Sequence, residues 1–364
     1  MPLSISALIP AFNRERFVGE AIESVRNQQR RVDEIIVVDD GSTDGTARVV
    51  ASFLDVQLIR LPQTRGTSGA RNAAIAAARG DVLAWLDSDD IWLPDHTATG
   101  VDLLERHPTA VVSFTGSQCF GQRHDFWPMP DVPEATPFDA VLSSFKRVLC
   151  TMSPAFTRRE VVASVQGFDE SLPCSVDFDL FLRLSLKGPF VCSHQVSAKY
   201  RWHGDQISSR LSRQLEAAYI SRMNLLRSLR DAGQGEQALR LRQWLPECLH
   251  MDLWSSWARR DPLSIETLVK LANVLHDASL LPKPFGRESV RDLRRYSMRR
   301  AETLGSPLKA TSVAQLFGRP RWLYKRALDA EMKYRWSRLT TPPEVWLCNL
   351  IEAGKAWGDL RRAS

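Results

Sequence analysis

The sequence predicts an α/β fold with a mostly parallel β-sheet and flanking helices, followed by an α-helical C-terminal region. Up to about residue 115, short apolar segments typical of buried strands alternate with amphipathic segments that have helical periodicity. From residue 212 onward the pattern is helical alone. A boundary between two regions is therefore expected near residue 210.

The N-terminal strands and helices alternate as in a parallel sheet. A continuous β-branched run at residues 34–38 is typical of a strand covered on both faces, and apolar segments at 4–10, 56–61 and 82–86 predict three further strands. Apolar residues at helical spacing predict helices after the first three strands, at Phe17 to Val25, at Val49 to Phe53 and at Ala70 to Ala78. Thr43 or Asp44 is expected to cap the second of these helices.

The later elements follow from the same patterns. We predict a helix at 95–106, a strand at 110–115, helices near 158–165 and 177–187, and a strand at 190–202. Loops are predicted at 119–140 and 146–156, and C-terminal helices at 215–229, 235–259 and 263–278.

Composition places the chain among soluble globular proteins, since 44% of its residues are hydrophobic and 25% are charged. No apolar run reaches the length of a membrane span, and the N-terminus lacks a basic secretory-signal region. The six cysteines have neither close pairing nor zinc-finger spacing. Reduced thiols and a cytoplasmic location are therefore expected.

Positive charge is concentrated at the C-terminal end. From residue 291 there are 16 Lys and Arg against 7 Asp and Glu, whereas residues 1–290 carry 32 against 35. Residues 287–300 and 319–338 interleave basic and aromatic side chains. This pattern fits a helical subdomain with a basic outer face, or peripheral contact with an anionic membrane at the cytoplasmic side. Nucleic-acid binding is not expected, because no recognised module is present.

An acidic cluster follows the fourth predicted strand. Asp87, Asp89 and Asp90 lie within four residues, where their carboxylates repel one another unless a cation neutralises them. The cluster therefore predicts a site for Mg²⁺ or Mn²⁺ at the carboxyl end of a strand. The alternative is an acidic turn that caps the helix beginning near Asp95.

Three strand ends carry unusual polar chemistry, and in a parallel sheet they meet at one edge. Phe12 could stack on a nucleotide base, Asp40 could accept an N–H from uracil, and a metal at Asp89 could neutralise a diphosphate. The first strand is not followed by G-x-G-x-x-G, and the G-x-x-x-x-G-K spacing is absent. A nucleoside diphosphate is therefore favoured over a dinucleotide cofactor or an NTPase site.

Seven ordered motifs resemble those of family 2 glycosyltransferases, which have the GT-A fold. They are IPAFN at 9–13, VVDDGSTDGT at 37–46, RGTSGARN at 65–72, LDSDD at 86–90, GFDESLP at 167–173, VDFDLFLRL at 176–184 and YRWHGDQIS at 200–208. The resemblance implies a catalytic domain at 1–210, with a nucleotide-sugar half at 1–115 and an acceptor half at 116–210. Residues 211–364 lie outside it, as a helical region.

The resemblance also implies roles for single residues at the donor site. It places donor-nucleotide contacts at Pro10, Phe12, Asn13, Asp40, Gly66, Arg71, Asp87 and Ser88. It implies that Asp89 and Asp87 hold a Mn²⁺ or Mg²⁺ cofactor together with His203, for which a surface imidazole is the alternative. Arg71 could instead form a surface salt bridge.

The acceptor side of the resemblance centres on Asp177. The acceptor hydroxyl has a high pKa and needs a general base, which the resemblance assigns to Asp177; the alternative is a helix cap. The family's usual Glu before this residue is Val176 here. Asp90, Asp179 and Arg201 are expected to contact sugar or acceptor, although Asp90 could face the metal and Asp179 could cap the helix.

The function expected from the resemblance is inverting transfer of a sugar from a nucleotide donor, with UDP favoured. The expected acceptor is a hydroxyl of a glycan or lipid-linked precursor in cell-surface polysaccharide synthesis. One alternative is a catalytically degenerate nucleotide-sugar-binding scaffold. Another is a sugar-nucleotide nucleotidyltransferase, which would need a Gly-rich basic loop that IPAFNRE at 9–15 does not provide.

Overall fold

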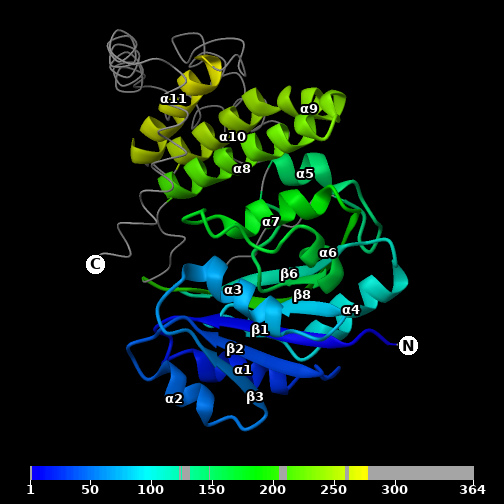
Figure 1. Ribbon diagram of the computed structural model, residues 1–364, viewed down its shortest axis with the longest axis vertical. Helices are drawn as coiled ribbons and strands as arrows, with labels where there is room; N and C mark the ends of the chain where they lie inside the picture. The colour runs from blue at the N-terminus through cyan, green and yellow to red at the C-terminus, as the bar shows by residue number, and fades with distance from the viewer. Residues whose placement is uncertain are drawn as a thin grey trace. The chain divides into compact units, whose positions relative to one another are not determined.

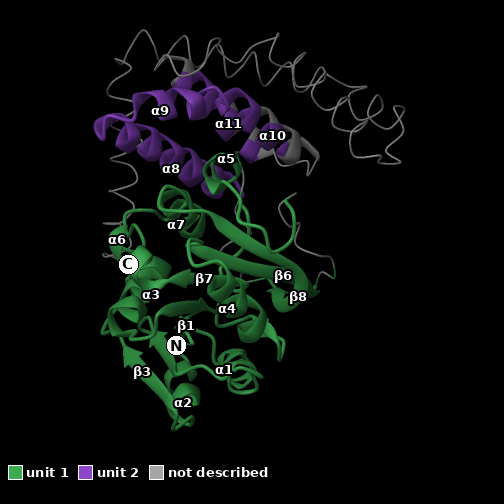
Figure 2. Cartoon of the chain, turned by 90° about the vertical axis from the view of Figure 1, so that its right-hand side faces the viewer, with its two compact units in different colours: residues 1–209 green, residues 210–364 purple. Residues whose placement is uncertain are grey.

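The computed structural model describes residues 2–122, 124, 132–146, 148–204, 211–258 and 262–277. The chain divides into two compact units, residues 1–209 and residues 210–364 (Figure 2). The two basic segments singled out in the sequence, 287–300 and 319–338, lie outside the described residues.

Four parallel strands form the N-terminal half of the sheet, as predicted: β1 (Ile5–Ala11), β2 (Glu34–Asp39), β3 (Val56–Arg60) and β4 (Val82–Trp85) (Figure 1). Their order is β3-β2-β1-β4. Ala11 pairs with Asp39 and Leu8 pairs with Trp85, so the carboxyl ends of β1, β2 and β4 lie beside one another.

The sheet is apolar on both faces, which explains the continuous apolar runs. Ile5, Ala7 and Ile9 of β1 share a core with residues of α1 (Val18–Arg26) and α4 (His96–Arg106). Side chains alternate along a strand, so Leu8 lies on the opposite face, where it is equally buried. The N-terminal unit therefore has the predicted α/β architecture.

The second half of the sheet is mixed. The full order is β3-β2-β1-β4-β7-β6-β8-β5, with β5 (Ile91–Trp92), β6 (Val112–Gly121), β7 (Ala155–Arg158) and β8 (Phe190–Trp202). β7 runs antiparallel to both of its neighbours, and β5 runs antiparallel to β8. β5 and β7 have two and four residues, too few to give a period-2 signal, and the sequence prediction missed both.

The remaining helices of this unit are α2 (Thr46–Ala51), α3 (Gly66–Ala77), α5 (Ala140–Lys146), α6 (Arg159–Ser164) and α7 (Val176–Ser185). α3 begins four residues before the predicted Ala70, because its first turn is GTSG and carries no helical signal. α5 was not predicted, and β6 continues to Gly121, past the expected start of the loop at 119. The N-cap position of α2 belongs to Gly45 rather than to Thr43 or Asp44, although Asp44 accepts a hydrogen bond from the amide of Thr46 at 2.9 Å.

The second unit consists, over the described residues, of α8 (Leu211–Asp231), α9 (Gly235–Arg242), α10 (Leu245–Ala258) and α11 (Pro262–Asp277). α8 packs against α9 and α11, and α10 packs against α11. The predicted helix at 235–259 is therefore two helices. Arg222 of α8 is buried, with its guanidinium 4.7 Å from the centre of the Tyr219 ring and 3.7 Å from Asp252.

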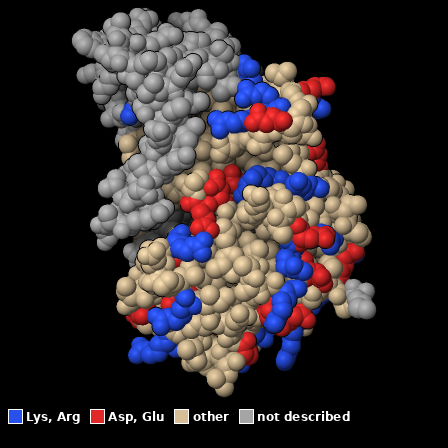
Figure 3. All heavy atoms as spheres, viewed as in Figure 1, with Lys and Arg blue, Asp and Glu red and all other residues tan. Residues whose placement is uncertain are grey.

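The described residues contain neither a membrane-spanning helix nor a disulfide. Within the described part of the chain, no helix combines the length and the apolar character that a bilayer crossing requires. Five of the cysteines lie in that part, and all five are free thiols. Basic and acidic side chains intermingle on the visible face of the described residues (Figure 3).

Candidate functional site

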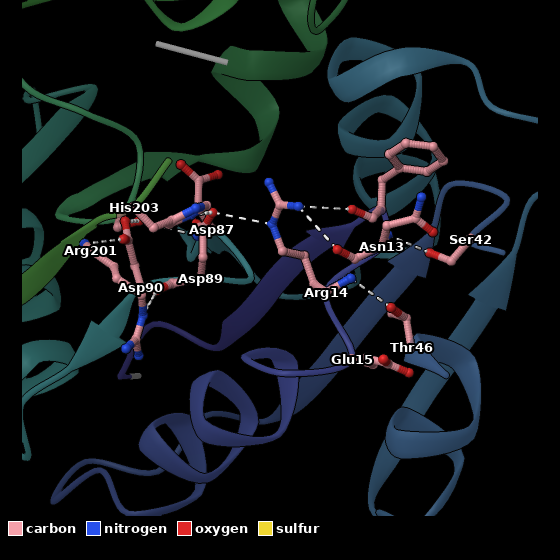
Figure 4. Close-up of polar contacts among 12 residues, drawn as sticks. Asn13, Arg14, Glu15, Ser42, Thr46, Asp87, Asp89, Asp90, Arg201 and His203 are labelled. Carbon is pink, nitrogen blue, oxygen red and sulfur yellow. Dashed lines mark hydrogen bonds and ion pairs between the residues drawn. The ribbon is translucent and has the colours of Figure 1, made fainter. Parts of the chain in front are cut away.

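The edge of the sheet where β1, β2 and β4 end carries the polar side chains singled out in the sequence. Phe12 and Asn13 follow β1, Asp39 ends β2, and Asp87 comes two residues after β4. Figure 4 shows Arg14 between the acidic cluster on one side and the Asn13–Ser42 contact on the other. The site is therefore assembled at the carboxyl ends of adjacent parallel strands.

Asp87 is paired with a buried arginine. Nη2 of Arg71, in the middle of α3, lies 2.6 Å from Oδ1 of Asp87, and Arg71 is only 5% exposed. The Arg71 guanidinium also lies over the Phe168 ring, 5.2 Å from its centre. Arg71 is therefore held inside the site rather than on a helix surface.

One carboxylate oxygen of Asp89 contacts the side chains of both His203 and Arg14. Nε2 of His203 lies 3.0 Å from Oδ2 of Asp89, and Nε of Arg14 lies 3.2 Å from the same atom. The structure thus brings His203 from beyond β8 to the acidic cluster. Arg14 was not among the predicted residues; its signal is a basic side chain three residues after the end of the first strand.

Asp90 is turned into the protein and is only 1% exposed. Its Oδ2 accepts a hydrogen bond from the Ser153 hydroxyl at 2.5 Å, and its Oδ1 accepts one from the Arg201 amide at 2.8 Å. Burial raises the pKa of Asp90 well above its usual range, and the charges of Asp89 and Asp87 act in the same direction. Both oxygens of this carboxylate are engaged by the protein.

Arg201 lies against the acidic turn through its backbone and its side chain. Its Nε donates to the carbonyl of Asp89 at 2.7 Å, and its Nη2 donates to Glu20 at 2.5 Å. The guanidinium lies 4.8 Å from the centre of the Phe17 ring and 4.3 Å from that of Phe120. These contacts fasten the end of β8 to the acidic cluster.

Asp40 forms a buried acceptor at the end of β2. Its two oxygens accept hydrogen bonds from the amide of Arg65 and the hydroxyl of Thr64, each at 2.7 Å. Burial raises the pKa of Asp40, and these hydrogen bonds oppose the shift. Asp39 accepts from the Ser42 amide at 3.0 Å and so stabilises the turn after β2.

The segment after β1 presents Phe12, which is 44% exposed. The next residue, Asn13, has a left-handed backbone (φ 52°), a conformation that Asn tolerates better than most residues. The side-chain oxygen Oδ1 of Asn13 accepts a hydrogen bond from the backbone amide of Thr43 at 2.9 Å, and the backbone amide of Asn13 donates one to Ser42 Oγ at 2.9 Å. Asn13 therefore fastens the segment after β1 to the loop after β2.

The remaining predicted donor-site residues are Pro10, Ser88 and Gly66. Pro10 belongs to β1 and is partly buried, and Ser88 is buried within the acidic turn. Gly66 begins α3 with φ 75°, and a Cβ there would meet no atom within 4 Å. The need for glycine at this position thus comes from the backbone conformation rather than from crowding.

Asp177 lies in the first turn of α7, one residue after the helix begins. The N-cap position belongs to Ser175, so Asp177 does not occupy it, although its Oδ1 accepts from the Phe178 amide at 2.8 Å. Burial raises the pKa of Asp177; the positive charge of Arg71 lowers it, and the charge of Asp87 raises it. Asp177 is therefore within electrostatic range of the Arg71–Asp87 pair.

Asp179 is occupied within its own helix. It pairs with Arg183 one turn later, at 2.6 Å, and Arg183 also donates to the carbonyls of Val165 and Gly167. The hydrogen bonds of Arg183 to these carbonyls connect α7 to the loop that carries Phe168.

The residues around Asp89 suit a divalent cation that is completed by substrate. Two cis ligands of an octahedral Mg²⁺ or Mn²⁺ ion are roughly 3.0 Å apart, and Asp89 Oδ2 and His203 Nε2 have this separation. Among the described residues no three Asp, Glu, His or Cys side chains converge as a complete metal cage. Mg²⁺ is commonly held by one or two carboxylates plus substrate phosphates, so the donor set fits a cation that binds with a diphosphate.

Comparison with known proteins agrees with this geometry. Residues 6–165 match the family model described as glycosyl transferase family 2. The match begins within β1 and includes β2 to β4, the acidic turn and β7. The N-terminal unit is therefore similar to glycosyl transferase family 2 over these residues, and the resemblance predicted from the motifs is confirmed there.

Several curated proteins are similar to the same part of the chain. The succinoglycan biosynthesis protein ExoO of Rhizobium meliloti (strain 1021) is 33% identical over 237 residues, covering 60% of this chain and 65% of that protein. The chondroitin synthase of Escherichia coli is 28% identical over 214 residues, covering 56% of this chain and 30% of that protein. The chain thus spans less than two thirds of the length of these relatives.

A solved structure shares the fold. The crystal structure of S. aureus TarS 1–349 in complex with UDP-GlcNAc superposes with a TM-score of 0.53 at 18% sequence identity, covering 84% of this chain and 93% of that one. This likeness supports the GT-A architecture of the sheet.

Proposed function

We propose that this protein is an inverting glycosyltransferase that transfers a sugar from a nucleoside diphosphate donor to a hydroxyl of a glycan or lipid-linked acceptor. The observation that carries the proposal is the ion pair of 2.6 Å between the buried Arg71 and Asp87 at the end of β4, whose charges both act on the carboxyl of Asp177 in the first turn of α7. A candidate base thus lies near a candidate diphosphate site. The names of the relatives support a role in cell-surface polysaccharide synthesis.

The donor nucleotide would bind where β1 and β2 end. The exposed Phe12 ring offers a stacking surface for the base, and Asp40 offers carboxylate lone pairs to a uracil N–H. UDP is favoured as the nucleotide because of Asp40 and because TarS was solved with UDP-GlcNAc.

The diphosphate would lie against the acidic turn and Arg71. Nε of Arg71 is buried without a hydrogen-bond partner among the described residues, and a phosphate oxygen would supply one. Asp89 and His203 would hold Mn²⁺ or Mg²⁺ together with diphosphate oxygens. When bound, the cation would neutralise negative charge that grows on the leaving diphosphate.

Asp177 would act as the general base. In a single displacement, the acceptor oxygen forms a bond to the anomeric carbon as the bond from that carbon to the diphosphate breaks. The acceptor proton moves to a carboxylate oxygen of Asp177, and the diphosphate leaves with the electron pair. Because burial raises the pKa of Asp177, its carboxylate is a stronger base than an exposed aspartate.

Donor binding and turnover test this proposal. A thermal-shift screen of UDP-, GDP- and dTDP-sugars with Mn²⁺ should reveal one nucleotide that raises the melting temperature. The protein should also hydrolyse that donor or transfer its sugar, and a chelator should abolish this activity. Stabilisation by a donor without turnover on any acceptor would favour the scaffold alternative instead.

The basic segments at 287–300 and 319–338 support a separate proposal of peripheral membrane contact near a lipid-linked acceptor. Flotation with anionic liposomes tests it. The full chain should float, and a chain ending at residue 285 should not. A truncated chain that still floats would exclude these segments as the anchor.

A further inference from the structure

A buried segment at residues 149–154 leads into β7 and has no part in the proposed function. Four of its residues are 2% exposed or less, namely Leu149, Cys150, Met152 and Ser153. The segment belongs to the second half of the sheet, whereas the acidic turn at 87–90 belongs to the first. Polar contacts between the two are therefore tertiary rather than local.

Ser153 connects this segment to both ends of the acidic turn. Its hydroxyl accepts a hydrogen bond from the Asp87 amide at 3.1 Å and donates one to Oδ2 of Asp90 at 2.5 Å. Its carbonyl accepts from Nε1 of Trp92 at 2.8 Å. One buried residue thus holds the residue that begins the turn, the residue that ends it, and the first large ring beyond it.

The chain of hydrogen bonds continues to β8. The second oxygen of Asp90 accepts from the Arg201 amide, and the Arg201 side chain donates to the carbonyl of Asp89. His203 lies two residues further and reaches Oδ2 of Asp89. A buried network from Ser153 through Asp90 to Arg201 therefore encloses the turn that carries Asp87 and Asp89.

The same segment passes near the candidate base. Burial raises the pKa of the Cys150 thiol well above its usual range, and the second cause is the negative charge of Asp177. Residues 150 and 153 thus approach the base and the acidic turn, respectively.

We propose that Ser153 is a positioning residue that fixes the Asp87–Asp90 turn in the geometry required for donor binding. Asp90 serves as its partner and does not contact the donor. Three neighbouring carboxylates repel one another, so the turn needs such an anchor to hold Asp87 and Asp89 in place. The effect on donor binding rests on the proposed function, whereas the anchoring of the turn rests on the hydrogen bonds alone.

Hydrogen exchange and nucleotide binding of two matched variants test the proposal. Ser153→Ala removes the anchor, whereas Ser197→Ala removes an equally buried hydroxyl that bonds to His96 at 2.9 Å and Thr115 at 2.8 Å. Amide exchange over residues 86–92 should accelerate at least tenfold in Ser153→Ala and stay within twofold of the parent in Ser197→Ala. With Mn²⁺ present, binding of the parent's preferred nucleotide among UDP, GDP and dTDP should weaken about tenfold in Ser153→Ala alone.

The two readouts separate the possible failures. Unchanged exchange over 86–92 in Ser153→Ala would overturn the anchoring. Faster exchange with unchanged nucleotide affinity would overturn its role in donor binding. A parent protein that binds none of the three nucleotides would overturn the proposed function, while the exchange data would still decide the anchoring.

Asp90→Asn provides a second variant if Ser153→Ala does not fold. It keeps the shape of the side chain but has one acceptor oxygen in place of two, so either the Ser153 hydroxyl or the Arg201 amide loses its acceptor. It should accelerate exchange over 86–92 in the same way. Parent-like exchange in a folded Asp90→Asn protein would contradict the proposal.

Discussion

Arg71 and Asp87 form an ion pair of 2.6 Å that joins the middle of α3 to the end of β4. The Phe168 ring packs against the Arg71 guanidinium, and both the amide and the carbonyl of Phe168 are bonded to the Asn72 side chain. A loop from the second half of the domain is thus fixed to the donor side of the site. The charges of this pair also act on Asp177, so the pair links the proposed diphosphate site to the proposed general base.

Replacement of Arg71 should weaken both donor binding and the fold. Arg71→Met leaves Asp87 without its partner in a partly exposed position, at an expected cost of about 1–3 kcal/mol in the free energy of unfolding. Binding of UDP should weaken at least tenfold, because a buried cation is lost. Calorimetric titration and denaturant unfolding measure the two effects.

Arg65→Met is the matched control for that change. Arg65 forms an exposed ion pair with Glu170 at 2.9 Å, and such pairs contribute little to stability. If the two variants bind UDP equally well, the assignment of Arg71 to the diphosphate site is wrong.

Phe12 should contribute to nucleotide affinity with little effect on stability. Loss of a base–aromatic stack costs about 1–3 kcal/mol, so Phe12→Ala should raise the dissociation constant of UDP roughly 5- to 150-fold. Phe12→Tyr retains a ring and should bind like the parent. If neither substitution changes the affinity for UDP, the nucleotide base does not stack on Phe12.

Arg14 should oppose metal binding in the absence of donor. Its Nε lies 3.2 Å from the Asp89 oxygen that a cation would also contact, so the two positive charges compete. Arg14→Met should therefore strengthen Mn²⁺ binding to the donor-free protein by about three- to tenfold, as measured by paramagnetic resonance of free Mn²⁺. Arg16→Met is the control, and weaker Mn²⁺ binding in Arg14→Met would reverse the assigned role.

His96 should make the fold sensitive to acid. The side chain is packed between Trp92 and Phe156, and burial lowers its pKa from 6.5 to about 3. The unfolded state takes up the proton near pH 6.5 while the folded state stays neutral, so stability falls as the pH drops below 6.5.

His96→Gln removes this titration. Whatever the deficit of the variant at pH 7.5, it should shrink by about 1.4 kcal/mol at pH 5.5, because only the parent loses stability there. Urea unfolding at the two pH values measures the difference. A deficit that is the same at both would show that His96 is not held neutral in the folded state.

The first half of the sheet could be predicted because its signals are local. The EIIVV run of β2 and the VLAW run of β4 are buried on both faces, and each ends in acidic residues at the expected edge. β5 and β7 could not be found this way. Their two and four residues are strands because β8, β4 and β6 lie beside them, and such pairing has no signature within the segment.

The candidate site shows the same division. The acidic turn and Asp40 are indicated by residue type and by position after a strand, whereas Asp177 is indicated by the resemblance of VDFDL at 176–180 to the family's motif. Ser153 is not indicated, because a serine in CTMSPAF is distinguished only by its contacts with Asp87 and Asp90, more than sixty residues earlier. Asp90 resembles its two neighbours in sequence, yet the backbone turns it into the core.

The central claim is that Asp177 takes the acceptor proton at a donor site built around Asp87 and Arg71. The measurement that tests it most directly compares Asp177→Asn with the parent in donor affinity and in transfer rate. The variant should bind the donor within about twofold of the parent, while transfer falls by about 10²- to 10⁴-fold. Transfer at the parent's rate would contradict the claim and would require a different base.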